Sequence, residues 1–514
     1  MNQDNTPILV ACGQVVDRTS DGSGATPVQL IAQACRAALV DSGSDRLLKK
    51  VDTIACCGLT VDADQVSTPL SGAYSNLPKT VANLLSIAPQ RTVYCATGGN
   101  TPQMLVNHYA NEIAEGRSGT VLLAGGEALR TMTQRFNHWS KLLLPKGAWR
   151  DKPGGKPTMI GDTRASGSQY EANYGLELPA NVYPLFENAL RAHYQRSNGE
   201  HMQKVGELFS DLSKVAATNP YAWFDRSRSV EELITPCATN RMIAYPYTKL
   251  LNSMLYVNQA ASLILTSVGQ ATALGIAKDK WVYLHGCADG HDIWNVGERV
   301  NYHTSPALNL LSKKALSMAG LSIEEIDHFD IYSCFPSAVQ VACDEFGIAH
   351  DDPRGLSQTG GLPYFGGPGN SYSLHAIAQM MTTLRQDPGK FGLVNANGWF
   401  LTKHSLGIYS TTPIESDWKS SDQKLIQQQI HQARGPTLIE NASGKCKIET
   451  FTVIFDKDNN PKRSIVICRL ENGDRFIGRT SSDSDVLNEL MTGEAIGRSA
   501  SVETRHKENI VMLD

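Results

Sequence analysis

A chain of 514 residues exceeds what one ordinary hydrophobic core supports, so its length predicts two or more domains. The formal net charge of −4 gives no general attraction to nucleic acid or to an anionic membrane surface, and no apolar run reaches the length that spans a bilayer. The eleven cysteines are scattered and form no C-x-x-C pair, which argues against a metal site and favours reduced thiols in the cytoplasm.

The first predicted element is a short buried strand at residues 8–12, and the residues before it lead us to expect no secretory signal, since they have no basic region or cleavage site. Thr26 and Pro27 then begin a helix. A second strand follows at residues 51–55. The order of strand, helix and strand is typical of an α/β fold.

Residues 91–129 carry the clearest pattern in the chain, which reads as strand, glycine turn, helix and strand. Gly98-Gly99 ends the first strand. Thr101-Pro102 then begins a helix, because a threonine hydroxyl can cap free N–H groups and proline fits the first turn, and apolar residues follow at helical spacing. A buried strand at residues 121–124 then runs into Gly125-Gly126-Glu127. Such a unit directs a turn and a helix N-terminus towards a pocket, and that N-terminus favours anions and thiolates.

The segment from Arg130 to Tyr247 is rich in Trp, Tyr, Arg and Lys and carries amphipathic helical patterns, such as the one from Pro184 to Arg196. Residues 252–266 then return to an apolar pattern, which predicts a helix and a buried strand. The composition therefore separates this segment from the flanking α/β patterns.

The α/β pattern recurs in the second half of the chain. Ser305-Pro306 begins a helix like the one at Thr26-Pro27, and a strand follows at residues 326–331. Gly369-Asn370-Ser371, a helix and residues 392–398 repeat the order of Gly99-Asn100-Thr101, its helix and its strand. Two matched units imply a duplicated α/β domain.

After Thr411 the composition changes to a polar segment with a helical stretch at residues 425–432. The remaining pattern predicts strands at 447–455, 464–470, 475–478, 495–503 and 509–513, with a short helix at 485–491. This pattern favours a small antiparallel barrel with its own core, one face of which docks on the preceding domain. Balanced charge and few aromatic residues argue against binding of single-stranded nucleic acid.

Leu123-Ala124-Gly125-Gly126-Glu127 and the duplicated pattern resemble the thiolase superfamily, especially the thiolases related to sterol carrier protein. The resemblance covers residues 7–410 and implies an α/β, layered αβαβα fold with an inserted loop domain. It divides the chain into an N-terminal half (1–130 and 248–285), a loop domain (131–247), a C-terminal half (286–412) and the additional barrel (413–514). By resemblance the loop domain covers coenzyme A. Lys141, Lys146 and Arg150 are then candidates to bind its phosphates, with a solvated basic face as the alternative.

The family's reactive cysteine lies in a C-x-S-G motif at the head of the helix that begins here at Thr101, and two registers compete for its position. Matching Cys95 to the motif makes Cys95 the nucleophile but requires an extra helical turn before Glu127. An alignment without gaps places Gly99 there instead. We favour Gly99, because the helix start leaves Cys95 in the strand, away from the helix N-terminus that lowers a thiol pKa.

Three further family positions lack their usual residue. Tyr332 stands where the family has the Asn or His that holds an oxyanion-hole water. Gly367 replaces the His that activates the nucleophile, and Asn395 replaces the Cys that shuttles protons. Because thiolysis needs a thiolate, a general base and donors to the oxyanion, classical thiolase activity is predicted to be absent while the fold is kept.

Cys334 and His404 are the remaining candidates for chemistry. Cys334 matches a cysteine of the sterol-carrier branch, but a buried cysteine is more often a small core residue. His404 follows the turn at Asn397-Gly398 and is a candidate base, with a structural histidine as the alternative.

The leading hypothesis is a protein that resemblance would name an acyltransferase, of the acetyl-CoA acetyltransferase kind, and whose pocket binds acyl-CoA or a related acyl thioester. The alternatives are an active thiolase that uses Cys95 and a non-catalytic interaction protein. We expect coenzyme A or acyl-CoA as a transient ligand and no permanently bound cofactor or metal. We also expect no nucleic acid partner, no membrane span, a monomer or homodimer, and a cytoplasmic role in lipid metabolism.

Overall fold

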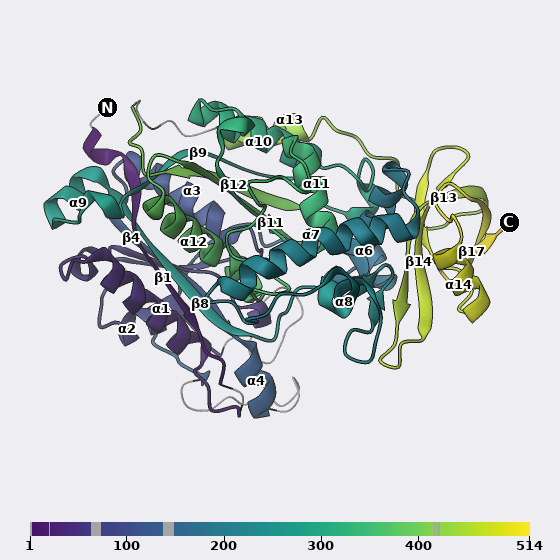
Figure 1. Cartoon of the computed structure of the whole chain (residues 1–514), viewed down its shortest axis with the longest axis horizontal. Coiled ribbons are helices and arrows are strands. Elements are labelled where there is room, and N and C mark those ends of the chain that lie inside the picture. The colour runs from purple at the N-terminus through teal and green to yellow at the C-terminus, as the bar shows by residue number, and fades with distance from the viewer. Residues whose placement is uncertain (1–2, 20, 63–72, 137–148, 416–417, 419–421) are drawn as a thin grey trace.

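The computed structural model describes residues 3–19, 21–62, 73–136, 149–415, 418 and 422–514 (Figure 1). Two of the predicted phosphate-binding residues, Lys141 and Lys146, lie outside these ranges. Within the described ranges no helix is both long enough and apolar enough to cross a membrane.

A ten-stranded mixed sheet forms the centre of the molecule, in the order β10-β11-β12-β9-β1-β8-β4-β2-β3-β5. Its strands are β1 (Pro7–Val16), β2 (Thr53–Cys56), β3 (Arg91–Cys95), β4 (Thr120–Ala128), β5 (Thr158–Ile160), β8 (Asn258–Ser267), β9 (Val282–His291), β10 (His328–Ile331), β11 (Phe391–Gly398) and β12 (Lys403–Ser410). The two halves meet where Ile8 and Leu9 of β1 pair with Tyr283 and Val282 of β9.

The halves repeat one topology, as the duplicated sequence pattern predicts. In the first half β2 runs parallel to β4, β4 pairs antiparallel with β8, and β8 pairs antiparallel with β1. In the second half β10, β11, β12 and β9 follow the same sequence of pairings. The predicted α/β, layered fold is therefore confirmed for the residues described.

Helices fill the space between the halves and cover their outer faces. Helices α3 (Thr101–Ala114) and α12 (Tyr372–Gln386) contact each other and strands of both halves, so they form the central layer. Helix α1 (Pro27–Ser42) packs on β1, β8 and β4, and α10 (Pro306–Ala319) packs on β9 and β12. The remaining helices of the two halves are α2 (Leu77–Leu84), α4 (Leu129–Phe136), α9 (Val268–Leu274) and α11 (Pro336–Phe346).

The predicted helix starts at two matched positions are confirmed. The Thr26 hydroxyl accepts a hydrogen bond from the N–H of Gln29, and the Ser305 hydroxyl accepts one from the N–H of Leu308. In both helices a proline follows the cap at the first helical position, where its missing N–H costs nothing.

The inserted segment contains α5 (Gln169–Asn173), α6 (Pro179–His193), α7 (Asn198–Thr218), α8 (Val230–Ile234), β6 (Met242–Ala244) and β7 (Tyr247–Thr248). The predicted start of its amphipathic helix at Pro184 is wrong, since α6 begins at Pro179 and Pro184 lies inside it. Pro179 supplies the favourable proline at the first turn of α6. The predicted helix before β8 is also wrong, because residues 252–257 form neither helix nor strand.

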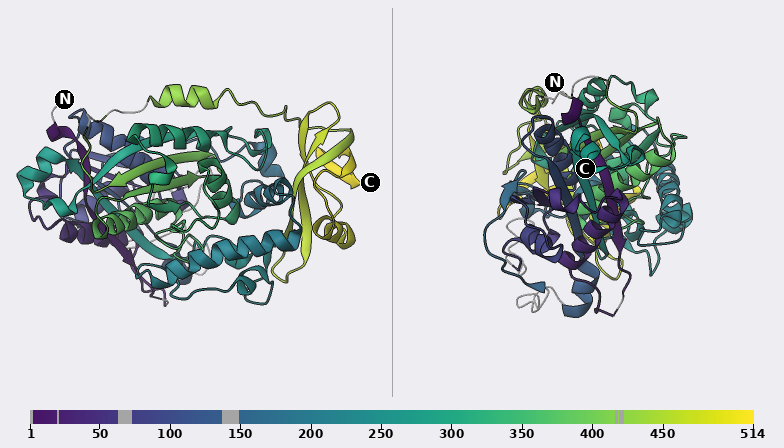
Figure 2. Two further views of the ribbon diagram at one scale, coloured as in Figure 1. Left: turned by 45° about the horizontal axis from the view of Figure 1, so that its top comes forward. Right: turned by 90° about the vertical axis from the view of Figure 1, so that its left-hand side faces the viewer.

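The C-terminal residues form a separate antiparallel sheet in the order β15-β14-β13-β16-β17, which β6 joins beside β13. Its elements are β13 (Gly444–Phe455), β14 (Pro461–Leu470), β15 (Arg475–Gly478), α14 (Ser484–Thr492), β16 (Ser499–Arg505) and β17 (Glu508–Leu513). Backbone hydrogen bonds between Arg479 and residues 509 and 511 bring the two outer strands together. Before this sheet, α13 (Gln423–Ile430) runs along the outside of the core (Figure 2).

This C-terminal sheet stands at one end of the molecule beside α6 (Figure 1) and buries both of its faces. One face forms its own core around Phe451, Val466 and Phe476. From the other, Ile465 and Ile467 belong to the large core cluster of the α/β halves and the inserted segment. The Thr450 hydroxyl donates to the carbonyl of Leu185 in α6 at 2.5 Å. The C-terminal sheet therefore packs directly against the rest of the protein and is not connected to it by the linker alone.

Candidate functional site

The head of α3 is the turn between β3 and the first helical residue, Thr101. The predicted capping role of Thr101 is wrong, because its hydroxyl donates to the carbonyl of Ala96 at 3.0 Å. The cap position belongs to Asn100, and no side-chain hydrogen bond caps the helix there. No side chain therefore caps the first N–H groups of α3, and the positive end of its helix dipole faces the neighbouring residues.

Cys95 is the last residue of β3, so it lies in the strand before the turn that leads into α3, as the alignment without gaps predicts. Its side chain is part of the large apolar core cluster, and burial raises the thiol pKa well above its usual range. A thiol held neutral in an apolar core is a poor nucleophile.

Gly99 lies at the head of α3 against Tyr332. A Cβ atom added at position 99 would approach Cζ of Tyr332 to 2.7 Å and the Asn397 carbonyl oxygen to 2.5 Å, and would approach the Tyr332 hydroxyl more closely still. Cβ atoms do not come this close to other heavy atoms, so Tyr332 occupies the space that a side chain at position 99 needs. The two departures from the family pattern, at positions 99 and 332, are complementary.

Tyr332 follows β10 and is adjacent to Asn395 of β11. The backbone N–H of Tyr332 donates to Oδ1 of Asn395 at 3.4 Å. Nδ2 of Asn395 is buried and has no hydrogen-bond partner among the described residues. Burial raises the pKa of the Tyr332 hydroxyl, which is therefore a neutral donor. The phenol thus stands against Gly99, and the Asn395 amide lies beside the backbone of Tyr332.

Gly367 lies in the loop before α12, and its N–H donates to the carbonyl of Met254 at 2.8 Å. A Cβ atom at this position would make only ordinary contacts of 3.4 Å or more. The space at position 367 would thus accept a side chain, but the residue there is glycine. No imidazole reaches the head of α3 from this loop.

Cys334 is buried near Asn397, whose Nδ2 lies 3.8 Å from its sulfur. Burial raises the pKa of the Cys334 thiol to about 12, so the thiol stays protonated at neutral pH. Nδ2 of Asn397 also donates to the Tyr183 hydroxyl at 2.8 Å. These contacts fit a packed core cysteine better than a nucleophile.

His404 is fully buried in β12, and burial lowers its imidazole pKa to about 4. Its Nε2 donates to the carbonyl of Leu401 at 3.1 Å and lies 3.4 Å from the Ser305 hydroxyl at the start of α10. The contacts with Leu401 and Ser305 hold the neutral imidazole ring on the side of β12 that faces α10. Its neighbours Lys403 and Ser405 face the opposite way, towards the head of α3, where they contact Thr97 and Asn100.

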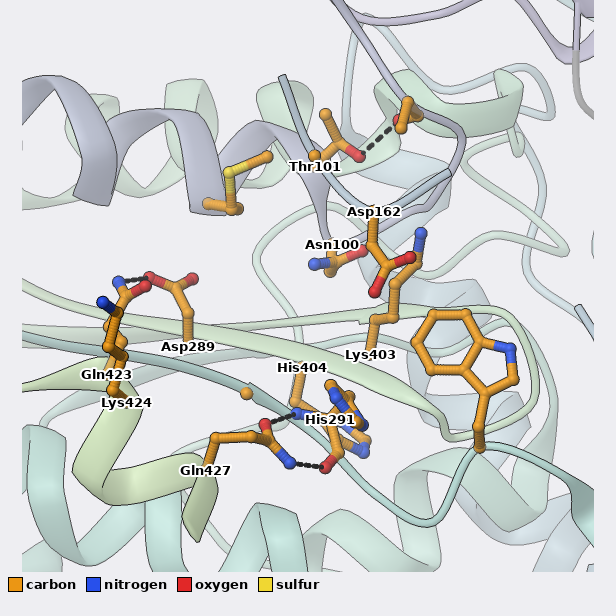
Figure 3. A pocket seen from close by; sticks show the side chains of 15 residues that line it. Asn100, Thr101, Asp162, Asp289, His291, Lys403, His404, Gln423, Lys424 and Gln427 are labelled. Atoms are coloured by element: carbon orange, nitrogen blue, oxygen red, sulfur yellow. Dashed lines mark hydrogen bonds between the residues drawn. The ribbon is translucent and has the colours of Figure 1, made fainter. Parts of the chain in front are cut away.

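A cavity of about 320 Å³ lies beside the head of α3, between β9, β12 and α13 (Figure 3). Asn100 and Thr101 line it from α3, Asp289 and His291 from β9, and Lys403 from β12. Gln423 and Gln427 project into it from α13 (Figure 3). None of the family's four catalytic positions lines this cavity, whereas His404 does.

Asp289 is the cavity's buried acid and was not singled out by the sequence. Burial raises its carboxyl pKa to about 7, although side-chain donors from Asn107 and Gln423 surround it at 3.0 and 2.7 Å. Lys403 was also missed in favour of its neighbour His404. The alternation of side chains along a strand was the available signal, because it separates the faces of residues 403 and 404.

Arg150, the described member of the predicted basic set, is exposed and lies outside this cavity. Within the described ranges no group of three or more His, Cys, Asp or Glu side chains is placed to hold a metal ion.

We expect Gly99→Ala to lower the free energy of unfolding by about 1–3 kcal/mol, because the new methyl group meets the Tyr332 ring. In a Tyr332→Leu background the same substitution should cost less. Urea denaturation of the four proteins in this cycle measures the coupling. Gly199→Ala in α7, where a Cβ meets nothing within 4 Å, is the matched control. Equal costs of Gly99→Ala in both backgrounds would contradict the complementarity of positions 99 and 332.

A family model described as the additional C-terminal domain of thiolase-like protein type 1 matches residues 425–507. The whole chain is similar to the crystal structure of a monomeric SCP2-thiolase-like protein type 1 from Mycobacterium smegmatis. The identity is 35%, the TM-score is 0.85 and 100% of each chain is covered.

Two thiolases share the fold at lower identity. The dimeric peroxisomal thiolase of Saccharomyces cerevisiae matches at 15% identity with a TM-score of 0.54, over 80% of this chain and 98% of that chain. Human mitochondrial 3-ketoacyl-CoA thiolase matches at 13% identity with a TM-score of 0.54, over 79% of this chain and 99% of that chain.

Proposed function

The chain belongs to the SCP2-thiolase-like proteins of type 1, within the thiolase superfamily, and on this premise we propose that it binds an acyl-coenzyme A ester or a related acyl thioester without carrying out thiolysis. The observation that carries the proposal is the place of Tyr332. Its ring and hydroxyl occupy the space that a nucleophile at position 99 would need. The name acetyl-CoA acetyltransferase, which resemblance suggests, would then describe ancestry rather than activity.

The alternative in which Cys95 is the nucleophile has less support. Cys95 lies in the apolar core with a raised thiol pKa, and glycine, at Gly367, stands where the family has its activating histidine. Cys334 likewise has a raised thiol pKa. The thiolase reaction requires a thiolate and a base together, so neither cysteine meets its needs.

Binding of a thioester is favoured by two donors, the Tyr332 hydroxyl against Gly99 and the Asn395 amide beside the Tyr332 backbone. Nδ2 of Asn395 is a buried donor without a partner in the described structure, and such a group gains most from a carbonyl oxygen. The neutral Tyr332 hydroxyl is a second donor. A carbonyl held by an amide and a phenol, with no nucleophile in reach, is bound and not cleaved.

Further parts of the proposal concern assembly and place in the cell. The relative from Mycobacterium smegmatis is described as monomeric, and in this chain β5 covers the outer edge of β3. We therefore propose a monomer, in which β5 protects an edge strand from pairing with a second chain. All eleven cysteines are unpaired, which supports a place in a reducing cytoplasm. The role in lipid metabolism rests on the proposed acyl thioester ligand.

Titration calorimetry tests the proposal directly. Acetyl-CoA should bind the full chain more tightly than coenzyme A, because only acetyl-CoA has a thioester carbonyl oxygen to accept from Asn395 and Tyr332. Asn395→Leu should weaken acetyl-CoA binding about tenfold, which corresponds to the loss of one good hydrogen bond. Asn309→Leu in α10, which removes a partly buried asparagine far from Gly99, should leave the affinity unchanged. Equal affinity for acetyl-CoA and coenzyme A, or no binding of either, would refute thioester recognition.

A further inference from the structure

Two cysteines lie beside each other on neighbouring strands of the C-terminal sheet. In the ladder between β13 and β14, Cys446 is opposite Leu470 and Cys468 is opposite Ile448, so the two cysteines are diagonal neighbours. Both side chains lie on the same face of the sheet, because both belong to the apolar cluster that forms the sheet's own core. No local spacing pattern reveals this pair, since the two residues come from different strands.

The two thiols are in contact with each other. Burial raises the pKa of the Cys468 thiol well above its usual range, and the hydrogen bond that it shares with Cys446 adds to the rise. The same hydrogen bond lowers the pKa of the Cys446 thiol, against the opposing effects of burial and of Asp514. Cys446 is therefore the thiol that ionises first, and a second sulfur atom is its neighbour.

The register of the two strands favours a bridging ion over a disulfide. Diagonal neighbours on antiparallel strands are about 7–8 Å apart, whereas a disulfide joins Cα atoms that are at most about 6.8 Å apart. One metal ion with two bonds to sulfur of about 2.3 Å each spans about 4.6 Å between the sulfur atoms. That span suits two thiols that already share a hydrogen bond, so an ion fits between them with little movement of the strands.

The surroundings of the pair select a soft ion that needs few ligands. A structural zinc ion takes four protein ligands, and within the described ranges no group of three or more His, Cys, Asp or Glu side chains is placed to hold a metal ion. Thiolates without other ligands prefer Cu(I) to hard ions such as Mg²⁺ and Ca²⁺. Val466 and Phe476 of the same apolar cluster offer no oxygen or nitrogen atom from their side chains, which suits a two-coordinate ion and opposes a hydrated one.

A path to the pair exists on one side. A cavity of about 580 Å³ on the C-terminal sheet is lined by Cys446 and Ile448 but not by Cys468, so Cys446 is the outer residue of the pair. From the register, the contact between the thiols and this path, we propose that Cys446 and Cys468 bind one Cu(I) ion between them as a two-coordinate bis-thiolate. Binding forms two copper–sulfur bonds, releases the two thiol protons to solvent and leaves the oxidation state of copper unchanged. This site is independent of the proposed thioester site at Gly99.

Anaerobic competition with bicinchoninate, a chromogenic Cu(I) chelator, tests the proposal on the full reduced chain. The wild-type protein should retain one Cu(I) per chain against the chelator. Cys446→Ser and Cys468→Ser should each weaken Cu(I) binding by about a hundredfold or more, because each removes one of the two ligands. Cys287→Ser on β9 is the matched control, since Cys287 is a similarly buried strand cysteine outside the pair, and it should leave the affinity unchanged. Absence of tight Cu(I) binding to the wild-type protein would refute the proposal.

X-ray absorption at the copper edge tests the coordination on the wild-type protein, so it does not depend on the folding of any variant. The spectrum should show two sulfur neighbours and no nitrogen or oxygen neighbour. Three or more ligands, or tight Zn(II) binding that both serine variants abolish, would overturn the assignment of a two-coordinate soft ion. Cu(I) that stays bound in both serine variants but is lost in Cys95→Ser, where Cys57 is the nearby thiol, would place the ion in the first half and overturn the site.

Discussion

No turnover of acetoacetyl-CoA with coenzyme A is expected from the purified protein at the rates of ordinary enzymes, which begin at about 1 per second. The reaction needs a thiolate at the head of α3, a base beside it and donors to the oxyanion. Here the head of α3 offers Gly99, the loop before α12 offers Gly367, and the buried thiol of Cys95 has a raised pKa. Loss of both nucleophile and base removes many orders of magnitude in rate.

Restoring the nucleophile alone should not restore thiolysis. A cysteine in Gly99→Cys would meet the Tyr332 ring, because even its Cβ lies within 2.7 Å of Cζ. The assay follows loss of acetoacetyl-CoA absorbance, with Cys95→Ala and Cys334→Ala as controls for adventitious thiol chemistry. Robust turnover that disappears in Cys95→Ala would establish the active thiolase instead and refute the proposed function.

Arg475→Met should lower the free energy of unfolding by about 3–5 kcal/mol, the cost of breaking a buried charge network. The Arg475 side chain is fully buried and pairs with Glu449 at 2.5 Å. Its guanidinium also donates to the carbonyls of Gly297, at 3.1 Å, and Arg299. These carbonyls belong to the second α/β half, so Arg475 joins the C-terminal sheet to the core.

Arg469→Met is the matched control, because Arg469 pairs with the same carboxylate of Glu449 at 2.5 Å. Its side chain is 33% exposed, so its removal should cost no more than about 1 kcal/mol. Urea denaturation followed by tryptophan fluorescence compares the two variants. If they are equally stable, the contact between the C-terminal sheet and the core contributes little, and the docked arrangement does not stabilise the protein.

The packing of the C-terminal sheet on the core limits the surfaces that a partner protein could bind if the chain is an interaction protein. One face of the C-terminal sheet packs against α6 and the large core cluster through Thr450 and Ile465. The other face packs in the sheet's own core through Phe451 and Val466. A partner would have to use the remaining strand edges or loops. The buried faces instead give this sheet a part in holding the inserted segment in place.

The sequence by itself determined the elements whose signals are local. The caps at Thr26 and Ser305, the glycine turn before Thr101 and the strand patterns in β14 and β15 depend on neighbouring residues only. The duplication was also readable, because both halves repeat the same order of helix and strand. These features fixed the α/β fold and placed Gly99 at the head of α3.

Only the tertiary structure decided what surrounds that position. Tyr332 fills the space above Gly99, and the two residues are brought together by strands of opposite halves. Gln427 of α13 covers the edge of β9, and Gly290 makes room for it. Such contacts join residues more than a hundred positions apart, so no local pattern encodes them. Close packing sets them, because each buried side chain must fill the space that its neighbours leave.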